Sequence, residues 1–288
     1  MTGGTTQVAN GKATVRQRIL GKRLRQMREE AGHTLESAAA ELEISASRLS
    51  RMETARQGVD VHVVRSILDL YDVGGDRWTS TLDLVREARK KQWWQKYKLG
   101  GPYHFVQFEA DAAQVQEFAI GYVPGILQAP DYARALFASS LIPRTPEALD
   151  MAIEIRTIRQ RRLVDATDPL QFVGIVTEEV LRNPVGGPDV LRAQLARLVE
   201  MVELPTVTLQ VLPARPGAHA SLESGFFVLS FGDLGEPDMA FVEHALGALH
   251  LDGQEEVSLA RNKFDQLRTM ALGPDDSLAL LREIAAAT

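Results

Sequence analysis

The side chains best placed to do chemistry in this 288-residue chain lie in one short stretch, residues 45–56, which reads SASRLSRMETAR. If the stretch is helical, Leu49 and Met52 share one face, and the serine and arginine side chains project from the rest of the cylinder. A guanidinium group carries a planar fork of N–H donors that forms paired hydrogen bonds with a planar acceptor. This chemistry is recognition by hydrogen bonding, with no bond made or broken.

Catalysis and metal binding have little support in the sequence. The chain has no cysteine, which excludes disulfides, Cys-ligated zinc and thiol nucleophiles. Its six histidines form no His-x-x-x-His pair, and the glycine-rich phosphate and nucleophile motifs are missing. His219, Ser221 and Glu223 are close in sequence, but they share one loop. We therefore expect no enzyme, no metal site and no cofactor.

Charge divides the chain into two unlike parts. The formal net charge is -6, yet residues 1–100 hold 18 Lys and Arg against 12 Asp and Glu, a balance of +6, and the remainder is acidic. Exposed charges interact over about one Debye length, roughly 8 Å at physiological salt. A basic N-terminal module can therefore approach a polyanion although the whole chain is acidic.

The spacing of apolar and capping residues predicts four helices in the N-terminal module. The first spans 16–31 and ends at Gly32, because apolar residues recur there every three or four positions. Thr34, Ser45 and Asp60 can each cap one of the next three helices, since their side-chain oxygens accept hydrogen bonds from free N–H groups of the first turn. The fourth helix should end near Gly74.

The order and spacing of these helices resemble the lambda-repressor/Cro-type helix-turn-helix, the XRE family, over about 16–73. Ala39, Leu42, Ile44, Leu49 and Met52 carry the resemblance. It implies that the third helix lies in the major groove of double-stranded DNA, with Ala46 limited to a methyl contact with thymine. The DNA-binding residues that it implies are Thr34, Ser45, Ala46, Ser47, Arg48, Ser50, Arg51 and Arg56.

Leu35 and Ala46 depart from the family pattern, since each stands where many relatives have glutamine, and two further departures affect the corners beside the third helix. Glu43 occupies a corner that is usually glycine, so it must adopt a positive φ or open the turn. Ala55 replaces the glycine that often follows the third helix, which predicts that this helix runs on towards Gly58. The resemblance also implies an ion pair between Arg28 and Glu53, which we interpret as a structural brace.

The connector, 76–104, is predicted to be helical and is rich in Lys and Arg. Its basic residues could extend the DNA contact, or Trp93, Trp94 and Tyr97 could pack into the second domain. The sequence favours packing.

The remainder, 105–288, is predicted to be an α/β domain with a mixed sheet and flanking helices. Strands are expected at 170–176, 206–213, 225–231 and 238–244, the first two parallel because a helix at 189–203 joins them. We expect helices at 108–118, 145–165, 254–272 and 275–286, and one that begins at Pro130. The chain is thus multidomain, with a flexible tail at 1–15 and an all-α helix-turn-helix domain at 16–75.

The stretch VPGILQAPDYARAL, 123–136, resembles an uncharacterised domain that follows an XRE head in actinobacterial regulators. That resemblance implies a protein-binding or sensing role, a small partner protein encoded nearby, and the description antitoxin-like. A groove lined by Tyr122, Ile126, Tyr132 and Phe137 is one interpretation of the stretch. The other is a shaped loop that holds packed helices.

The function predicted from the sequence is a cytoplasmic, homodimeric, DNA-binding transcriptional regulator. Its C-terminal domain is expected to sense a ligand or small partner protein and to control operator binding. The alternative is an antitoxin-like interaction module that sequesters a small partner, with DNA binding secondary. No apolar run is long enough to span a bilayer, so no membrane partner is expected.

Overall fold

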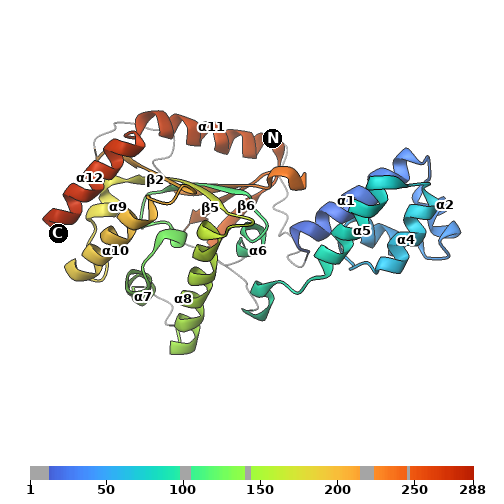
Figure 1. Ribbon diagram of the computed structural model, residues 1–288, viewed down its shortest axis with the longest axis horizontal. Helices are drawn as coiled ribbons and strands as arrows, with labels where there is room; N and C mark the ends of the chain where they lie inside the picture. The colour runs from blue at the N-terminus through green and yellow to red at the C-terminus, as the bar shows by residue number, and fades with distance from the viewer. Residues whose placement is uncertain (1–12, 98–104, 140–143, 215–223, 245–246) are drawn as a thin grey trace, which may run out of the picture. The chain divides into compact units, whose positions relative to one another are not determined.

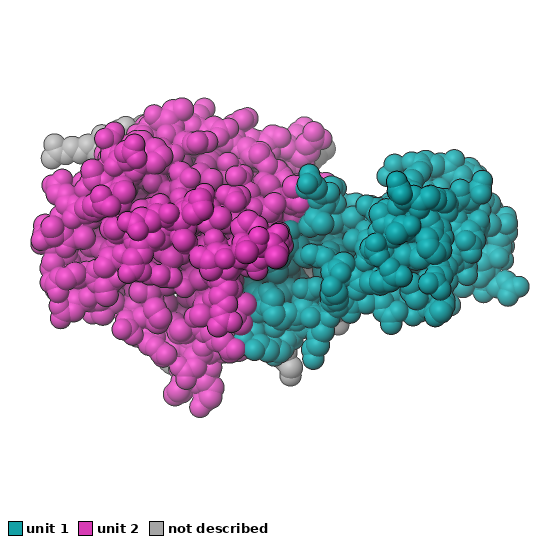
Figure 2. Space-filling model, viewed as in Figure 1, with its two compact units in different colours: residues 1–99, 106–111, 233–236 teal, residues 100–105, 112–232, 237–288 magenta. Residues whose placement is uncertain are grey.

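The computed structural model describes residues 13–97, 105–139, 144–214, 224–244 and 247–288. Most of the predicted tail, the end of the connector and the His219, Ser221 and Glu223 trio lie outside these ranges. The chain divides into two compact units, shown in two colours in Figure 2. The first contains Met1–Leu99, Val106–Asp111 and Asp233–Glu236, and the second contains Gly100–Phe105, Ala112–Gly232 and Pro237–Thr288. The predicted combination of a helical domain with an α/β domain is confirmed.

The first unit is helical throughout its described residues. It consists of α1 (Val15–Glu30), α2 (Leu35–Glu41), α3 (Ala46–Glu53), α4 (Val61–Leu70), α5 (Gly75–Arg89), η1 (Trp93–Tyr97) and α6 (Val106–Glu109). Each predicted cap is present: Thr34 accepts a hydrogen bond from the Ser37 amide, Ser45 from that of Arg48, and Asp60 from that of His62. Local side-chain chemistry therefore sets where α2, α3 and α4 begin.

The core of the first unit is built where α1, α3, α4 and α5 meet. Leu24, Leu49 and Ile67 are fully buried in it. Gly21 allows the backbone of α3 to approach α1, because a Cβ at this position would lie 2.5 Å from the carbonyl oxygen of Glu53. The distance between the two helices is thus set by the lack of a side chain at residue 21.

The two corners beside α3 both contain a residue with positive φ that is not glycine. Glu43 has φ 54°, as expected for the turn between α2 and α3. Ala55 has φ 56°, and α3 ends at Glu53. The prediction that α3 runs on towards Gly58 is therefore wrong. A left-handed residue after the last turn ends the helix, because it lets the following amides bond back to the open carbonyls of that turn.

Arg28 and Glu53 form the predicted ion pair, which joins α1 to the last turn of α3. The Arg28 Nε lies 2.7 Å from Glu53 Oε1 and the Arg28 Nη2 lies 3.0 Å from Glu53 Oε2, while Arg28 Nη1 donates to the His33 carbonyl at 2.9 Å. The two residues are 7% and 6% exposed, so water competes little with the paired bonds. The hydrogen bond with Glu53 raises the pKa of Arg28, and burial, with the Glu53 charge beside it, raises the pKa of Tyr71 to about 12.

The second unit is built on a six-stranded mixed sheet in the order β3-β2-β1-β4-β5-β6. The strands are β1 (Gln114–Ala119), β2 (Gln171–Thr177), β3 (Val207–Leu212), β4 (Phe226–Ser230), β5 (Met239–His244) and β6 (Gly247–Leu251). β1, β2 and β3 run parallel, whereas β4, β5 and β6 form an antiparallel meander beside β1. The parallel pair predicted at 170–176 and 206–213 is confirmed.

Helices cover both faces of the sheet (Figure 1). On one face, α11 (Gln254–Met270) packs through Val257, Phe264 and Leu267 against Phe118 and Phe226 of the sheet. Figure 1 shows α7 (Pro130–Ala138) and α8 (Pro146–Arg161) on the opposite side. The other elements are η3 (Gly125–Leu127), η4 (Arg162–Val164), α9 (Glu178–Arg182), α10 (Pro188–Met201), η5 (Gly232–Leu234) and α12 (Pro274–Ala287).

Two parts of the second unit differ from the sequence-based prediction. The helix expected at 108–118 is wrong, since α6 ends at Glu109 and residues 114–119 form β1. β1 lies between β2 and β4 and pairs with both, so tertiary pairing overrides a local pattern that fits a helix. β6 was not predicted either, because its exposed sequence GALHL has little strand signal of its own.

Replacing Gly21 by alanine should destabilise the first unit, because the new Cβ meets backbone atoms of α3 that no rotamer change can move. We expect a loss of about 1–3 kcal/mol in the free energy of unfolding, measured by urea denaturation of the full chain. Gly58→Ala is the matched control, since nothing lies within 4 Å of its Cβ position. Equal stability of the two variants would contradict the close crossing of α1 and α3.

Replacing Arg28 by methionine should lower the free energy of unfolding by about 3–5 kcal/mol, because the Glu53 carboxylate is left buried without its partner. The matched control is Arg25→Met, which breaks an exposed pair with Glu29 and should leave the stability nearly unchanged. The double variant Arg28→Met/Glu53→Leu should recover much of the loss, since it removes both buried charges. A double variant no more stable than Arg28→Met would count against the brace.

Candidate functional site

The surface of α3 carries the predicted DNA-binding side chains. Leu49 and Met52 are buried against the core, whereas Ser47 and Arg51 are exposed, one turn apart on the outer side of the helix. Arg48 is half-buried, and its guanidinium makes no hydrogen bond or ion pair with any residue that the structure describes. The helix therefore presents two guanidinium groups and a hydroxyl on its outer surface.

Arg51 is held in place by two neighbours. Its Nη1 donates to Ser47 Oγ at 2.7 Å and its Nε donates to Gln57 Oε1 at 3.2 Å. These bonds use two of about five guanidinium N–H donors, and the outer edge formed by Nη1 and Nη2 keeps enough donors for a bidentate contact. The side chain is thus oriented before any partner binds, which lowers the entropy lost on binding.

Gln57 is a functional candidate that the sequence reasoning missed. It lies beyond the end of α3, and the chain brings it back because Ala55 has a positive φ. The Arg51 carbonyl oxygen accepts hydrogen bonds from the amides of Arg56 and Gln57, at 2.8 and 3.1 Å. A helix that continued through residue 58 would have carried this side chain elsewhere, so the error about the end of α3 also hid Gln57.

The other predicted contacts take several positions around α3. The Thr34 and Ser45 hydroxyl oxygens accept the capping bonds of α2 and α3, so each retains its O–H as a donor. Ala46 and Ser50 are half-buried, and Arg56 is exposed just past the helix. The structure therefore places all eight predicted residues in or beside α2 and α3.

Several basic residues of α1 are engaged in ion pairs within the first unit. Arg16 pairs with Glu87 and Asp111 at 3.0 and 2.9 Å. Arg18 and Lys22 both lie 2.9 Å from the buried carboxylate of Glu236. Because Asp111 and Glu236 come from beyond residue 100, the balance of +6 counted from the sequence overstates the positive charge of this unit.

The groove predicted at Tyr122, Ile126, Tyr132 and Phe137 does not form as one surface. Ile126 and Tyr132 are 1% and 0% exposed and belong to the core of the second unit. Phe137 packs under the guanidinium of Arg156, 4.4 Å from its ring centre. Tyr122 borders the cavity at the end of β1 that is described below.

Residues 123–129 instead form a short loop that contains η3 and is braced by buried amides, and α7 follows from Pro130, in line with the alternative interpretation of a shaped loop beside packed helices. Gln128 donates to the Val123 carbonyl at 2.7 Å and accepts from the Arg156 Nε at 2.9 Å. Gln194 of α10 donates to the Leu127 carbonyl at 3.0 Å and accepts from the Ala129 amide at 2.7 Å. Gln128 and Gln194 are fully buried, so these bonds satisfy loop groups that water cannot reach.

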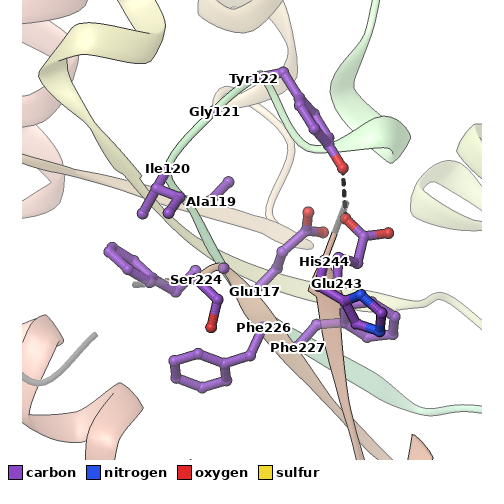
Figure 3. Close-up of a pocket in the computed structure, with 12 residues that line it drawn as sticks. Glu117, Ala119, Ile120, Gly121, Tyr122, Ser224, Phe226, Phe227, Glu243 and His244 are labelled. Atoms are coloured by element: carbon purple, nitrogen blue, oxygen red, sulfur yellow. Dashed lines mark hydrogen bonds between the residues drawn. The ribbon is translucent and has the colours of Figure 1, made fainter. Parts of the chain in front are cut away.

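A cavity of about 390 Å³ opens at the end of β1 in the second unit (Figure 3). β1 and the turn after it form one wall, and the start of β4 and the end of β5 form the others. The lining residues are Glu117, Phe118, Ala119, Ile120, Gly121, Tyr122, Ser224, Gly225, Phe226, Phe227, Glu243 and His244. The sequence reasoning identified only Tyr122 among them, because the strands that contribute the others are far apart in the chain.

The polar end of this cavity is acidic. The Tyr122 hydroxyl donates to Glu243 Oε2 at 2.5 Å, and Figure 3 shows the Glu117 carboxylate at the same end of the cavity. Burial, the Glu243 charge and its hydrogen bond, and then the Glu117 charge raise the pKa of Tyr122. The described lining contains no Lys or Arg side chain.

In the part of the chain that the structure describes, no group of three or more His, Asp and Glu side chains could hold a metal ion. Among the same residues, no helix combines the length and the apolar character needed to cross a membrane.

Each of the two parts of the chain matches a family profile of known proteins. A family profile described as a helix-turn-helix domain matches residues 19–78, which supports a DNA-binding regulator. A second profile, described as a domain of unknown function (DUF5753), matches residues 103–283. No curated protein and no solved structure matches the chain. Because the second match spans well over half of its length, the chain belongs to the DUF5753 family.

Proposed function

We propose that this protein is a sequence-specific transcriptional regulator of the XRE type, in which α3 reads the major groove of an operator. The observation that carries the proposal is the exposed Arg51, which Ser47 and Gln57 hold in one orientation on a helix-turn-helix. An oriented guanidinium fork matches the O6 and N7 acceptors of guanine, a contact that contributes about 1–3 kcal/mol of discrimination.

The neighbouring residues have complementary roles in this proposal. Arg48, one turn from Arg51 on the same helix, reaches a base or a phosphate. Ala46 offers a methyl contact to thymine, and Thr34 and Ser45 donate their hydroxyl protons to phosphate. Phosphate contacts fix the register of the helix on the duplex, while the arginines read sequence.

In this proposal, the protein acts as a cytoplasmic homodimer. Two helix-turn-helix domains on half-sites about one turn of DNA apart, roughly 34–36 Å, multiply the specificity of one small module. The second unit is proposed to respond to a ligand or a small partner protein and so to change how the two recognition helices are spaced. A displacement of a few ångströms would misplace one of them.

Sequestration of a small partner protein, with DNA binding secondary, is the alternative that the sequence left open. Operator binding and partner capture are separable by experiment. Under sequestration, the Arg51→Ala variant would retain its biological effect while losing its operator. Under the proposal made here, the two would be lost together.

Replacing Arg51 by alanine should weaken specific binding by about ten- to a hundredfold, because a bidentate base contact is lost. The operator is first located by footprinting on the DNA upstream of the protein's own gene, and affinities are then measured by fluorescence anisotropy. Arg161→Ala, which removes an exposed arginine from α8, is the control for loss of charge. A loss of less than twofold for Arg51→Ala would overturn its assignment.

Replacing Gln57 by alanine should weaken specific binding by about two- to tenfold, since one hydrogen bond that orients Arg51 is removed. Binding to unrelated DNA should stay unchanged, because Gln57 carries no charge. In the Arg51→Ala background the same substitution should have no further effect. Equal losses in both backgrounds would show that Gln57 acts independently of Arg51.

A further inference from the structure

The cavity at the end of β1 has no part in reading DNA, yet it has the position of a binding site. It lies beyond the carboxyl end of β1, between β1 and β4. The chain leaves β1 towards β2 and β3 on one side, and it returns as β4 on the other side. In open α/β sheets, ligands bind in the crevice outside the carboxyl ends of strands at such a reversal of strand order.

Strand geometry explains why two carboxylates meet in this cavity. Glu117 of β1 lies opposite Phe227 of β4, and Phe227 lies opposite Phe241 of β5, two residues before Glu243. Because side chains alternate between the faces of a sheet, Glu117 and Glu243 are on the same face. Phe118, on the other face, packs with α11.

The cavity combines these carboxylates with an aromatic wall. Phe227, which is on the same face as the two carboxylates, is 6% exposed and borders the cavity directly. Phe227 stacks on Phe241 with ring centres 5.0 Å apart, which fixes its position. Partly buried carboxylates beside aromatic rings favour a cation, because the charge of each carboxylate and the negative face of each ring attract it.

Glu243 retains hydrogen-bonding capacity for a ligand. One oxygen of Glu243 accepts from the Tyr122 hydroxyl, but a carboxylate offers about four lone-pair sites. The volume of about 390 Å³ is near the lower end of the range for small-molecule sites, roughly 300–1,000 Å³. A compact ligand with one charged end and one apolar end therefore fits best.

We propose that this cavity binds a compact organic cation, an amine or guanidine on an apolar body, with its charged end at Glu117 and Glu243 and its apolar end against Phe227. The proposal names the ligand class for the sensing role proposed above, and its regulatory meaning rests on that role. Binding itself does not depend on DNA.

Isothermal titration of the full chain with three probes of similar size tests the proposal. The probes are 2-phenylethylamine as the cation, 2-phenylethanol as the neutral analogue and 3-phenylpropionate as the anion. We expect saturable binding of the amine, at least about tenfold tighter than that of either analogue, because charge-assisted hydrogen bonds are the stronger kind. Equal binding of all three probes, or no binding of the amine, would overturn the proposal.

Variants locate the binding. Glu117→Gln/Glu243→Gln keeps the side-chain shapes and should weaken amine binding about tenfold or more, whereas Glu283→Gln, an exposed carboxylate on α12, should leave it unchanged. Undiminished binding of the amine by the double variant, or an equal loss of binding in Glu283→Gln, would contradict the assigned site.

Operator affinity, measured with and without saturating amine, separates this inference from the proposed function. A change in affinity supports both. If the amine binds as expected but operator affinity stays the same, the ligand class stands and the sensing role fails. If operator binding is confirmed and no amine binds, the DNA-reading role stands and the ligand class is wrong.

Discussion

The buried pair of Arg28 and Glu53 is the interaction on which the DNA-reading surface depends. It joins the last turn of α1 to the last turn of α3 through two parallel hydrogen bonds. A pair of this kind adds little net stability compared with apolar residues of the same size, but it tolerates only one arrangement of its partners. We infer that its main contribution is geometric, because it fixes where α3 lies against α1.

The ion pair restricts the position of α3, and a series of contacts extends this restriction to the exposed side chains. Gly21 lets α1 and α3 touch, Ala55 turns the chain back after Glu53, and that turn brings Gln57 against Arg51. Each step reduces the freedom of the next group. A recognition arginine held in this way loses little entropy on binding, which favours specificity over loose attraction to phosphate.

In the second unit, too, buried polar contacts fix the position of a segment, but the groups involved are amides and not charges. Buried amides of Gln128 and Gln194 hold the short loop around η3 by hydrogen bonds to its backbone. The reversal of strand order beside β1 then leaves a cavity that the loop and helices do not fill. The groups at its polar end come from β1, β5 and the turn after β1, so the site exists only once the sheet has formed.

Local patterns in the sequence determined the helices of the first unit, with their caps at Thr34, Ser45 and Asp60. They also determined the pairing of Arg28 with Glu53 and most strands of the second unit. These features depend on neighbours within a few residues or on strong family motifs. Tertiary structure decided the rest. It made β1 a strand, because pairing with β2 and β4 outweighs local helical spacing. It ended α3 at a positive φ and so placed Gln57. It also brought Glu117 and Glu243 together from strands more than a hundred residues apart, which no local pattern records.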